Sequence, residues 1–385
     1  MSLFKKCVDL NPNFRKPLDI GLIWEGNYWD DQDVHDCCDV DWDTVDILIR
    51  KISKSLHLPT APEDSENSEN PENSENPNKI LIFLPKILQL PLTILAGYHA
   101  GFQVLIMNPL TTKTETLKDV ILTETPKFLI TVDAFWQGQE LIEVKNSIEV
   151  YIPKIPKIQK FQKFKNSKIQ ILEILNRAHF QPIISSIPST QLLIIRHVSP
   201  NPGVPPPKKH FPARRPSYRT QLDLHDGRDW EWSTVMAGIT VPKVSEDPFN
   251  WKNRDVIFKF YDGKGKSHPV SHTELLDALE ARKVGLEAKI GTKNHVENFL
   301  VLDFPENLGS LVDLLIPWYM GKTLTLYEGP PNYPDSSRLA QIISKHNVNV
   351  VLGDCSIPNP EYLNFFKVPS LKFVESPQLS NYFKS

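Results

Sequence analysis

The chain has 385 residues, of which 40% are hydrophobic and 23% are charged, and its formal net charge is −3. This length predicts two or three subdomains with a sizeable core, and the charge gives no support to a nucleic-acid-binding class with a strongly basic surface. No apolar run reaches the roughly 18 to 20 residues that span a bilayer, and 16 glycines against 33 prolines disfavour Gly-rich phosphate loops.

The N-terminal residues lack the apolar stretch of a secretory signal. We therefore expect an intracellular, soluble protein, and the sequence leaves the mitochondrial matrix and the cytoplasm open. None of the four cysteines has the C-x-x-C spacing of a metal site. They are predicted to be free thiols in a reducing compartment: Cys7, Cys37, Cys38 and Cys355.

An Asp-rich loop at residues 30–41 precedes the first clear helix. It lacks the spacing and the closing Glu of a calcium-binding EF-hand, so a solvated loop without metal is expected. The helix that follows begins at Asp43 or Thr44, either of which can cap it. Its apolar face is marked by helical periodicity at Val45, Leu48, Ile49, Ile52 and Leu56.

Three segments have compositions that do not fit a packed core. Residues 60–78 consist almost wholly of Ser, Glu, Asn and Pro and predict a disordered surface insertion. In residues 151–168 lysines recur at every third position between Ile and Phe, which predicts a solvated extended arm. Contact with an anionic membrane surface and an RNA-binding strip are its functional alternatives. Residues 199–220 are basic and Pro-rich and predict an exposed docking arm.

Elsewhere apolar runs alternate with amphipathic segments, which predicts parallel sheets with helices on their faces. The pattern of apolar residues is clearest in residues 297–353, where it predicts strand–helix–strand–helix–strand. The expected strands are residues 79–85, 102–110, 127–133, 192–198, 256–261, 299–302, 323–327 and 348–352.

Three short segments have sequences that resemble the acetyl-CoA synthetase branch of the acyl-adenylating (AMP-forming acyl-CoA ligase) family. They are residues 22–26 (Leu-Ile-Trp-Glu-Gly), 227–232 and 327–348. The third of these contains Glu-Gly-Pro-Pro-Asn-Tyr-Pro before a helix that ends in Lys-His. The resemblance implies an α/β fold with mainly parallel sheets flanked by helices, like the N-terminal part of such an enzyme, with the C-terminal domain absent.

On this basis we expect the chain to divide into segments with distinct roles. The expected division is 1–59, N-terminal segment and helix; 60–78, insertion; 79–198, first α/β subdomain with the Lys-rich arm; 199–220, basic Pro-rich insertion; and 221–385, second α/β subdomain, truncated.

The family places its phosphate-binding loop directly after the strand at residues 256–261. Here the hydroxyl pairs of that loop are missing and Asp262 puts a negative charge where phosphate would sit. We expect a surface turn between that strand and a helix beginning near His272. The residues that fit a degenerate phosphate loop are Gly263, Lys264, Gly265 and Lys266.

The family's later nucleotide-binding motifs have no counterpart after Ser376. We therefore expect a truncated and degenerate pseudoenzyme without catalytic residues, metal or cofactor. Its predicted role is a structural or accessory subunit, with partner subunits covering the exposed sheet. The alternative is residual acetate activation with ATP (or AMP) and CoA, as one half of a split enzyme or as a fragment. A nucleic-acid partner and a transmembrane segment are not expected.

Overall fold

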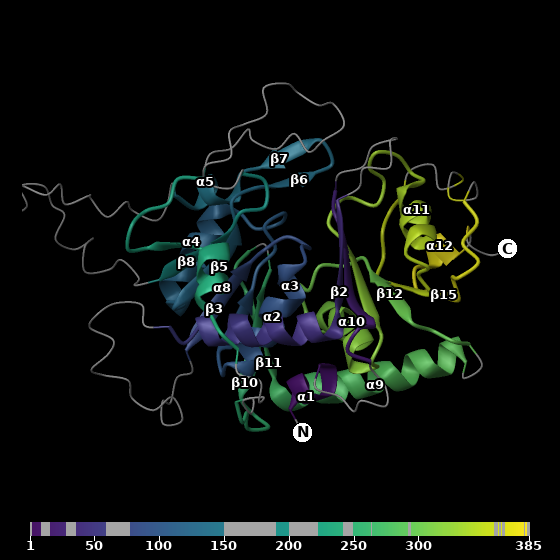
Figure 1. Cartoon of the computed structure of the whole chain (residues 1–385), viewed down its shortest axis with the longest axis horizontal. Helices are drawn as coiled ribbons and strands as arrows, with labels where there is room; N and C mark the ends of the chain where they lie inside the picture. Colours follow the sequence, from purple (N-terminus) through teal and green to yellow (C-terminus); the bar gives the residue numbers. More distant parts are fainter. Residues whose placement is uncertain are drawn as a thin grey trace, which may run out of the picture.

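Two mainly parallel sheets lie beside each other in this computed structural model (Figure 1). The structure describes residues 2–8, 16–27, 36–58, 78–149, 190–199, 222–241, 249–262, 264–291, 294–357, 361, 363, 366–380 and 382. The three segments with unusual composition lie outside these residues, apart from Asn78 and Ser199.

The first sheet has seven strands in the order β11-β10-β4-β3-β5-β8-β9. Its neighbours pair in parallel except β10 and β11, which form an antiparallel hairpin at one edge. The strands are β3 (Lys79–Phe83), β4 (Gln103–Ile106), β5 (Phe128–Val132), β8 (Gln191–Ile195), β9 (Asp229–Glu231), β10 (Val256–Tyr261) and β11 (Ser267–Ser271).

The second sheet has six strands in the order β15-β14-β12-β13-β1-β2, and only β1 and β2 pair antiparallel. A separate two-stranded hairpin is formed by β6 (Phe135–Gln137) and β7 (Glu140–Ile142). The six strands are β1 (Ile20–Glu25), β2 (Cys37–Asp41), β12 (Asn298–Val301), β13 (Thr323–Tyr327), β14 (Val350–Leu352) and β15 (Phe373–Val374).

Helices flank both sheets, which confirms the predicted fold class. None of the described helices combines the length and the apolarity needed to cross a membrane. The helices are α1 (Leu3–Cys7), α2 (Trp42–Ser55), α3 (Gln89–His99), α4 (Thr114–Glu124), α5 (Val144–Glu149), α8 (Trp232–Gly238), α9 (His272–Ile290), α10 (Leu308–Tyr319), α11 (Arg338–Lys345) and α12 (Pro377–Ser380).

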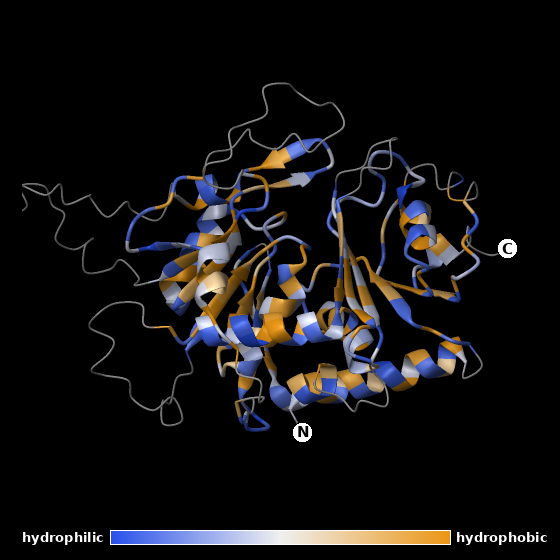
Figure 2. Cartoon of the chain, viewed as in Figure 1, coloured by the Kyte–Doolittle hydropathy of each residue, from blue (hydrophilic) through white to orange (hydrophobic). Residues whose placement is uncertain are grey.

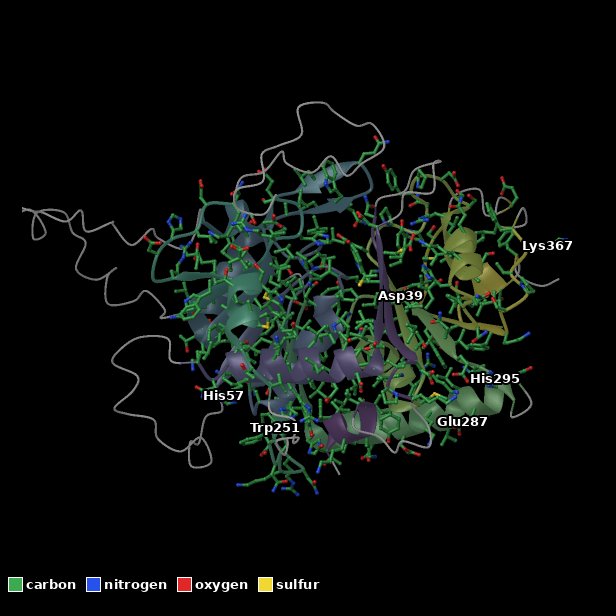
Figure 3. All side chains as sticks on the ribbon, in the orientation of Figure 1. Asp39, His57, Trp251, Glu287, His295 and Lys367 are labelled. Atoms are coloured by element: carbon green, nitrogen blue, oxygen red, sulfur yellow. The ribbon has the colours of Figure 1, made fainter. Side chains whose placement is uncertain are left out.

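The strands of both sheets are largely hydrophobic, whereas the long helix α9 mixes polar and apolar residues (Figure 2). Side chains fill the space between the ribbons, and Glu287 and His295 lie near the outer end of α9 (Figure 3). One core cluster of buried side chains contains residues from both sheets. Trp318 of α10 is fully buried in it, and its indole N–H donates to the carbonyl of Gly21 in β1 over 2.8 Å.

Several local predictions need correction. The cap of α2 is Asp41, whose carboxylate accepts from the Thr44 amide over 2.8 Å, rather than Asp43 or Thr44. Cys37–Asp41 form strand β2 and not a loop, because they pair with β1. Between residues 261 and 272 the chain adds strand β11 to the predicted turn, and α9 then begins at His272 as expected. The predicted strand–helix alternation of residues 297–353 is confirmed.

Sheet membership does not follow chain order. β1 and β2, from the N-terminal segment, join the strands that follow residue 297, while β9, β10 and β11 join the sheet formed by residues 79–195. Each sheet therefore combines strands that lie far apart in the sequence.

Candidate functional site

The predicted phosphate loop is the turn that joins β10 to β11, at one edge of the seven-stranded sheet. Gly263 lies outside the described residues. Lys264 and Lys266 are exposed. Gly265 has a φ of +82°, which favours glycine, and a Cβ there would lie 3.2 Å from the Thr116 side chain of α4.

The backbone amides of the described residues Lys264, Gly265 and Lys266 are bonded within the turn itself. The carboxylate of Asp262 accepts from the amides of Lys264 and Lys266, each over 2.9 Å. The amide of Gly265 donates to the carbonyl of Asp262 over 2.9 Å. The bonds from Lys266 and Lys264 lower the pKa of Asp262, so its carboxylate is ionised at neutral pH. An internal anion thus takes the donors that a phosphate would need.

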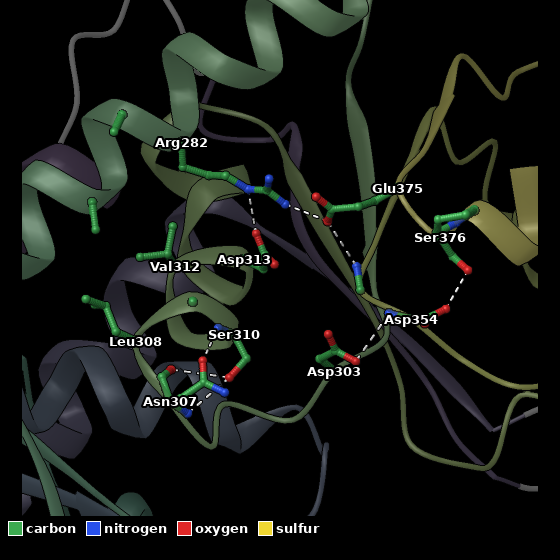
Figure 4. A pocket seen from close by; sticks show the side chains of 15 residues that line it. Arg282, Asp303, Asn307, Leu308, Ser310, Val312, Asp313, Asp354, Glu375 and Ser376 are labelled. Atoms are coloured by element: carbon green, nitrogen blue, oxygen red, sulfur yellow. Dashed lines mark hydrogen bonds and ion pairs between the residues drawn. The ribbon is translucent and has the colours of Figure 1, made fainter.

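A cavity of about 750 Å³ opens in the second sheet, where β12, β14 and β15 end and α9 passes α10 (Figure 4). Residues at the carboxyl ends of parallel strands commonly line ligand sites. The three predicted phosphate-loop residues that the structure describes, Lys264, Gly265 and Lys266, do not belong to its lining. The lining consists of Ala278, Ala281, Arg282, Asp303, Asn307, Leu308, Gly309, Ser310, Val312, Asp313, Gly353, Asp354, Glu375, Ser376 and Pro377.

Arg282 organises the charges of this cavity. Its guanidinium reaches Asp313 of α10 over 2.7 Å and Glu375 over 2.6 Å, as the dashed lines in Figure 4 show. Burial raises the pKa of Asp313 to about 6, and the attraction of Arg282 offsets only part of this. Burial acts to raise the pKa of Glu375 as well. The hydrogen bond from Arg282 and the positive charge of Arg282 outweigh this effect, so the pKa of Glu375 is lowered.

The lining carries four carboxyl groups against one guanidinium, and that guanidinium already bonds two of them. The other two are Asp303, whose pKa is raised by burial, and Asp354, which accepts a hydrogen bond from the Ser376 hydroxyl. Such a lining repels phosphates and carboxylates and favours neutral or cationic ligands. Among the described residues, no group of three or more His, Cys, Asp or Glu side chains is placed to hold a metal ion.

The raised pKa of Asp313 gives a prediction for the pH dependence of stability. The pKa of Asp313 is higher in the folded protein than in the unfolded chain, so the protonated carboxyl stabilises the fold. This stabilisation is complete below about pH 4 and is lost as the pH rises through about 6. We expect Asp313→Asn to be more stable, relative to the wild type, at pH 7.5 than at pH 4.5, by about 1 to 2 kcal/mol. Urea unfolding at both pH values measures this difference.

The control for that experiment is Asp46→Asn, at the partly buried ion pair that Asp46 forms with Arg50 within α2. The stability of this variant is measured at the same two pH values and compared with that of Asp313→Asn. Equal pH dependence in the Asp313 variant and the wild type would contradict the prediction.

Sequence reasoning missed the cavity, although part of its signal was present. Asp303, Asp354 and Glu375 each follow a predicted strand or the start of one, and parallel strands bring such positions to one edge. Arg282 and Asp313 lie on two helices, and nothing in their spacing indicates that the helices place them 2.7 Å apart.

The segments that resemble the family make structural contacts. Glu25 of β1 is fully buried and binds Arg338 over 2.6 Å, Lys345 over 2.8 Å and His346 over 2.9 Å, so it joins β1 to α11. Glu328 binds His197 over 2.7 Å and thereby joins the end of β13 to the loop after β8.

Gly329 in the third of these segments, and Asn27 directly after the first, are constrained as well. A Cβ on Gly329 would lie 2.6 Å from the Asn27 side-chain oxygen and 2.6 Å from the Tyr327 hydroxyl, so any larger residue would force these side chains to move. The Asn27 side chain in turn brackets Gly138 of the β6–β7 hairpin, donating to its carbonyl over 2.9 Å and accepting from its amide over 2.8 Å. In the segment at 227–232, the buried carboxylate of Asp229 binds Lys145 over 2.9 Å.

Comparison with known proteins gives two kinds of match, and no protein-family model matches the chain. The Caenorhabditis elegans protein named "Uncharacterized protein ZK112.6" is 61% identical over 150 residues, which is 39% of this chain and 96% of that protein. "Uncharacterized protein ZK112.5" from the same organism is 61% identical over 152 residues, 37% of this chain and 96% of that protein.

Acetyl-coenzyme A synthetases match a smaller part of their own length. That of Shewanella denitrificans is 28% identical over 166 residues, 40% of this chain and 24% of the enzyme. That of Marinobacter nauticus is 45% identical over 136 residues, 34% of this chain and 20% of the enzyme. The aligned part of the chain thus spans about a quarter or less of these two enzymes.

The structure of acetoacetyl-CoA synthetase from Streptomyces lividans matches 98% of this chain and 47% of that chain, with a TM-score of 0.61 and 14% identity. At this identity the match establishes the fold alone. The sequence matches to acetyl-CoA synthetases independently point to the same relationship. The chain therefore belongs to one family with the nematode proteins ZK112.6 and ZK112.5, and it is related to the acyl-adenylating enzymes.

Proposed function

We propose that this protein is a catalytically inactive relative of the acyl-adenylating enzymes that serves as a structural or accessory subunit of a larger protein assembly. The observation that carries the proposal is the closed turn between β10 and β11. Its amides at Lys264 and Lys266 are bonded to Asp262, whose own negative charge opposes a phosphate at the same place. The described amides at the position where the family resemblance expects ATP phosphates are thus already bonded, which supports the loss of ATP binding.

The lining of the cavity supports the same proposal. An acyl-adenylate and CoA both carry phosphates, and four carboxyl groups face the cavity against a single guanidinium. Bringing a phosphate into this field adds repulsion to the cost of its desolvation. The charge of the described lining therefore supports a protein that holds neither a nucleotide nor CoA in this cavity.

Support for a partner subunit comes from the outer face of α9, next to the cavity. Val284 is 57% exposed, and Ala281 and Ala288 are exposed one turn before and after it. These positions form an apolar strip on one helix face, of the kind that a partner chain covers. The size of the native particle, compared with the purified chain in sedimentation, tests this part. A stable single chain in both preparations would count against an accessory subunit.

Isothermal titration calorimetry of the full chain with ATP, and separately with an acetyl-adenylate analogue, tests the loss of acyl activation. We expect no heat of binding at millimolar ligand, because the donors of the turn are occupied and the cavity repels anions. Micromolar affinity for either ligand would contradict the proposed inactivity.

A matched variant then separates the alternative, residual acyl-CoA ligase activity as part of a split enzyme. If the wild type binds ATP and the double variant Lys264→Ala/Lys266→Ala does not, the degenerate loop still holds phosphate and the alternative gains support. The specific observation in its favour is that an open cavity persists at the strand ends. The thermal unfolding curve of the variant shows whether it is folded.

A further inference from the structure

The cavity at the ends of β12 and β14 has two unlike sides. Leu308 and Val312 of α10, together with Ala278 of α9, give it an apolar side. Asp303 and Asp354 lie on the opposite side, where the strands end, as Figure 4 shows. A ligand that is complementary to both sides has an apolar body and a polar head.

The polar side is formed by three carboxyl groups around Gly353, the residue that follows β14. A Cβ on Gly353 would lie 2.8 Å from Oδ2 of Asp303, and the Gly353 amide donates to Glu375 over 3.5 Å. Asp354 is the next residue. Burial raises the pKa of Asp303, and repulsion from Asp354 and Glu375 adds to this effect, which the Asp354 amide and the charge of Lys86 offset only in part. A cation placed among the three groups would relieve this repulsion.

Two oxygens on this side are available to such a cation. Among the described residues, Oδ2 of Asp303 and Oδ2 of Asp354 accept no hydrogen bond, because the bonds to both side chains end on Oδ1. Neither side chain forms an ion pair in that part of the chain, whereas Arg282 holds Asp313 and Glu375. Carboxylates with open acceptor positions and no paired cation favour a positively charged hydrogen-bond donor.

The arrangement of these groups favours an organic cation over a metal ion. In the described part of the chain, no three His, Cys, Asp or Glu side chains are placed to coordinate one ion. A primary ammonium group donates up to three hydrogen bonds in different directions, so the carboxylates need not converge on a single point. An alkyl chain on that ammonium group reaches the apolar side, where each buried CH₂ raises the affinity about fourfold.

We propose that this cavity binds primary alkylammonium ions, with the ammonium group at Asp303 and Asp354 and the alkyl chain against Ala278, Leu308 and Val312. The inference goes beyond the proposed accessory role and does not depend on it. The binding involves neither ATP, nor the turn at residues 262–266, nor a partner subunit.

Isothermal titration calorimetry of the full wild-type chain with hexylammonium chloride at neutral pH and low ionic strength tests the proposal. We expect saturable binding at one site, with lower affinity at high salt because the attraction is screened. Hexan-1-ol has the same alkyl chain without the charge and should bind at least about tenfold more weakly. Hexanoate, which carries the opposite charge, should give no heat of binding. Equal affinities for hexylammonium and hexan-1-ol, or no saturable binding of millimolar hexylammonium, would overturn the proposal.

Two pairs of variants locate the bound ion. Asp303→Asn removes a charge from the lining, and its control Asp277→Asn removes one from an exposed position of α9 outside the lining. Ala278→Met fills part of the apolar side, and its control Ala288→Met adds the same side chain at an exposed position outside the lining.

We expect the two variants of the lining to weaken hexylammonium binding about tenfold each and the two controls to change it less than about twofold. Thermal unfolding shows whether each variant is folded. If Asp303→Asn does not fold, the alanine pair and the comparison of ligands on the wild type still decide. Equal affinities within the folded pairs would place the ion elsewhere and contradict the proposal.

Discussion

Replacing Glu25 by Ala is expected to lower the free energy of unfolding by about 3 to 5 kcal/mol. Glu25 and Arg338 are both fully buried and lie 2.6 Å apart, so removing the carboxylate leaves a guanidinium in the core without its counter-charge. Lys345 and His346 lose their hydrogen bonds to Glu25 in the same variant. Urea unfolding at pH 7, followed by circular dichroism, measures the effect.

Two further variants make this prediction specific. Asp46→Ala removes an (i, i+4) ion pair with Arg50 within α2, in which the Asp46 carboxylate is partly exposed, and should cost no more than about 1 kcal/mol. The double variant Glu25→Leu/Arg338→Met should be more stable than Glu25→Ala, because neither buried charge remains. Equal stability of Glu25→Ala and Asp46→Ala would contradict the structural role assigned to Glu25.

The same carboxylate makes the stability depend on pH in the acid range. Burial acts to raise the pKa of Glu25, but the hydrogen bonds from His346 and Lys345 and the charge of Arg338 lower it to about 2. Because the pKa of Glu25 is lower in the folded protein than in the unfolded chain, its ionised carboxylate stabilises the fold. This stabilisation is present above about pH 4.3 and is lost as the pH falls toward 2. The difference in stability between the wild type and Glu25→Gln should therefore shrink over this range.

Asp133→Ala is expected to cost about 3 kcal/mol or more, by a different mechanism. The buried carboxylate of Asp133, at the end of β5, accepts from four backbone amides: Ala134 over 2.7 Å, His197 over 2.8 Å, Val198 over 3.2 Å and Ser199 over 2.6 Å. Three of these amides belong to the loop after β8. Truncation leaves buried donors without acceptors and releases that loop.

Asp133→Asn is the control that keeps the shape of the side chain. One oxygen remains as an acceptor for the amides of Ala134, His197 and Val198, but the NH₂ group now faces the Ser199 amide, donor against donor. An intermediate loss of about 1 to 2 kcal/mol is expected. If Asn and Ala destabilise the protein equally in thermal and urea unfolding, the shared acceptor is not what holds the loop.

The fold was predictable from the sequence because parallel strands buried on both faces read as continuous apolar runs. Phe299–Leu302 and Val348–Leu352 are such runs, and the structure places β12 and β14 there. The corrections concern the edges of the sheets: β2 and β11 are short, polar and exposed, so their strand character arises only from pairing with β1 and β10.

Only those residues of the candidate site that come directly after strands were predictable from the sequence. Asp303, Asp354 and Glu375 stand at strand ends, a position that parallel sheets use for ligands. The partnership of Arg282 with Asp313 depends on how α9 crosses α10, and neither helix carries a periodic signal for it.

The sequence by itself determined the α/β class, the positions along the chain of the central parallel strands and the resemblance to acyl-adenylating enzymes, since these depend on local periodicity and on short runs of residues. Tertiary structure alone decided what the resembling residues do. Glu25, Glu328 and Asn27 join elements that lie more than a hundred residues apart, and Asp262 closes the turn from which phosphate contacts were expected. The reason is physical: burial and the partners of a charge set its energy, and both depend on long-range packing.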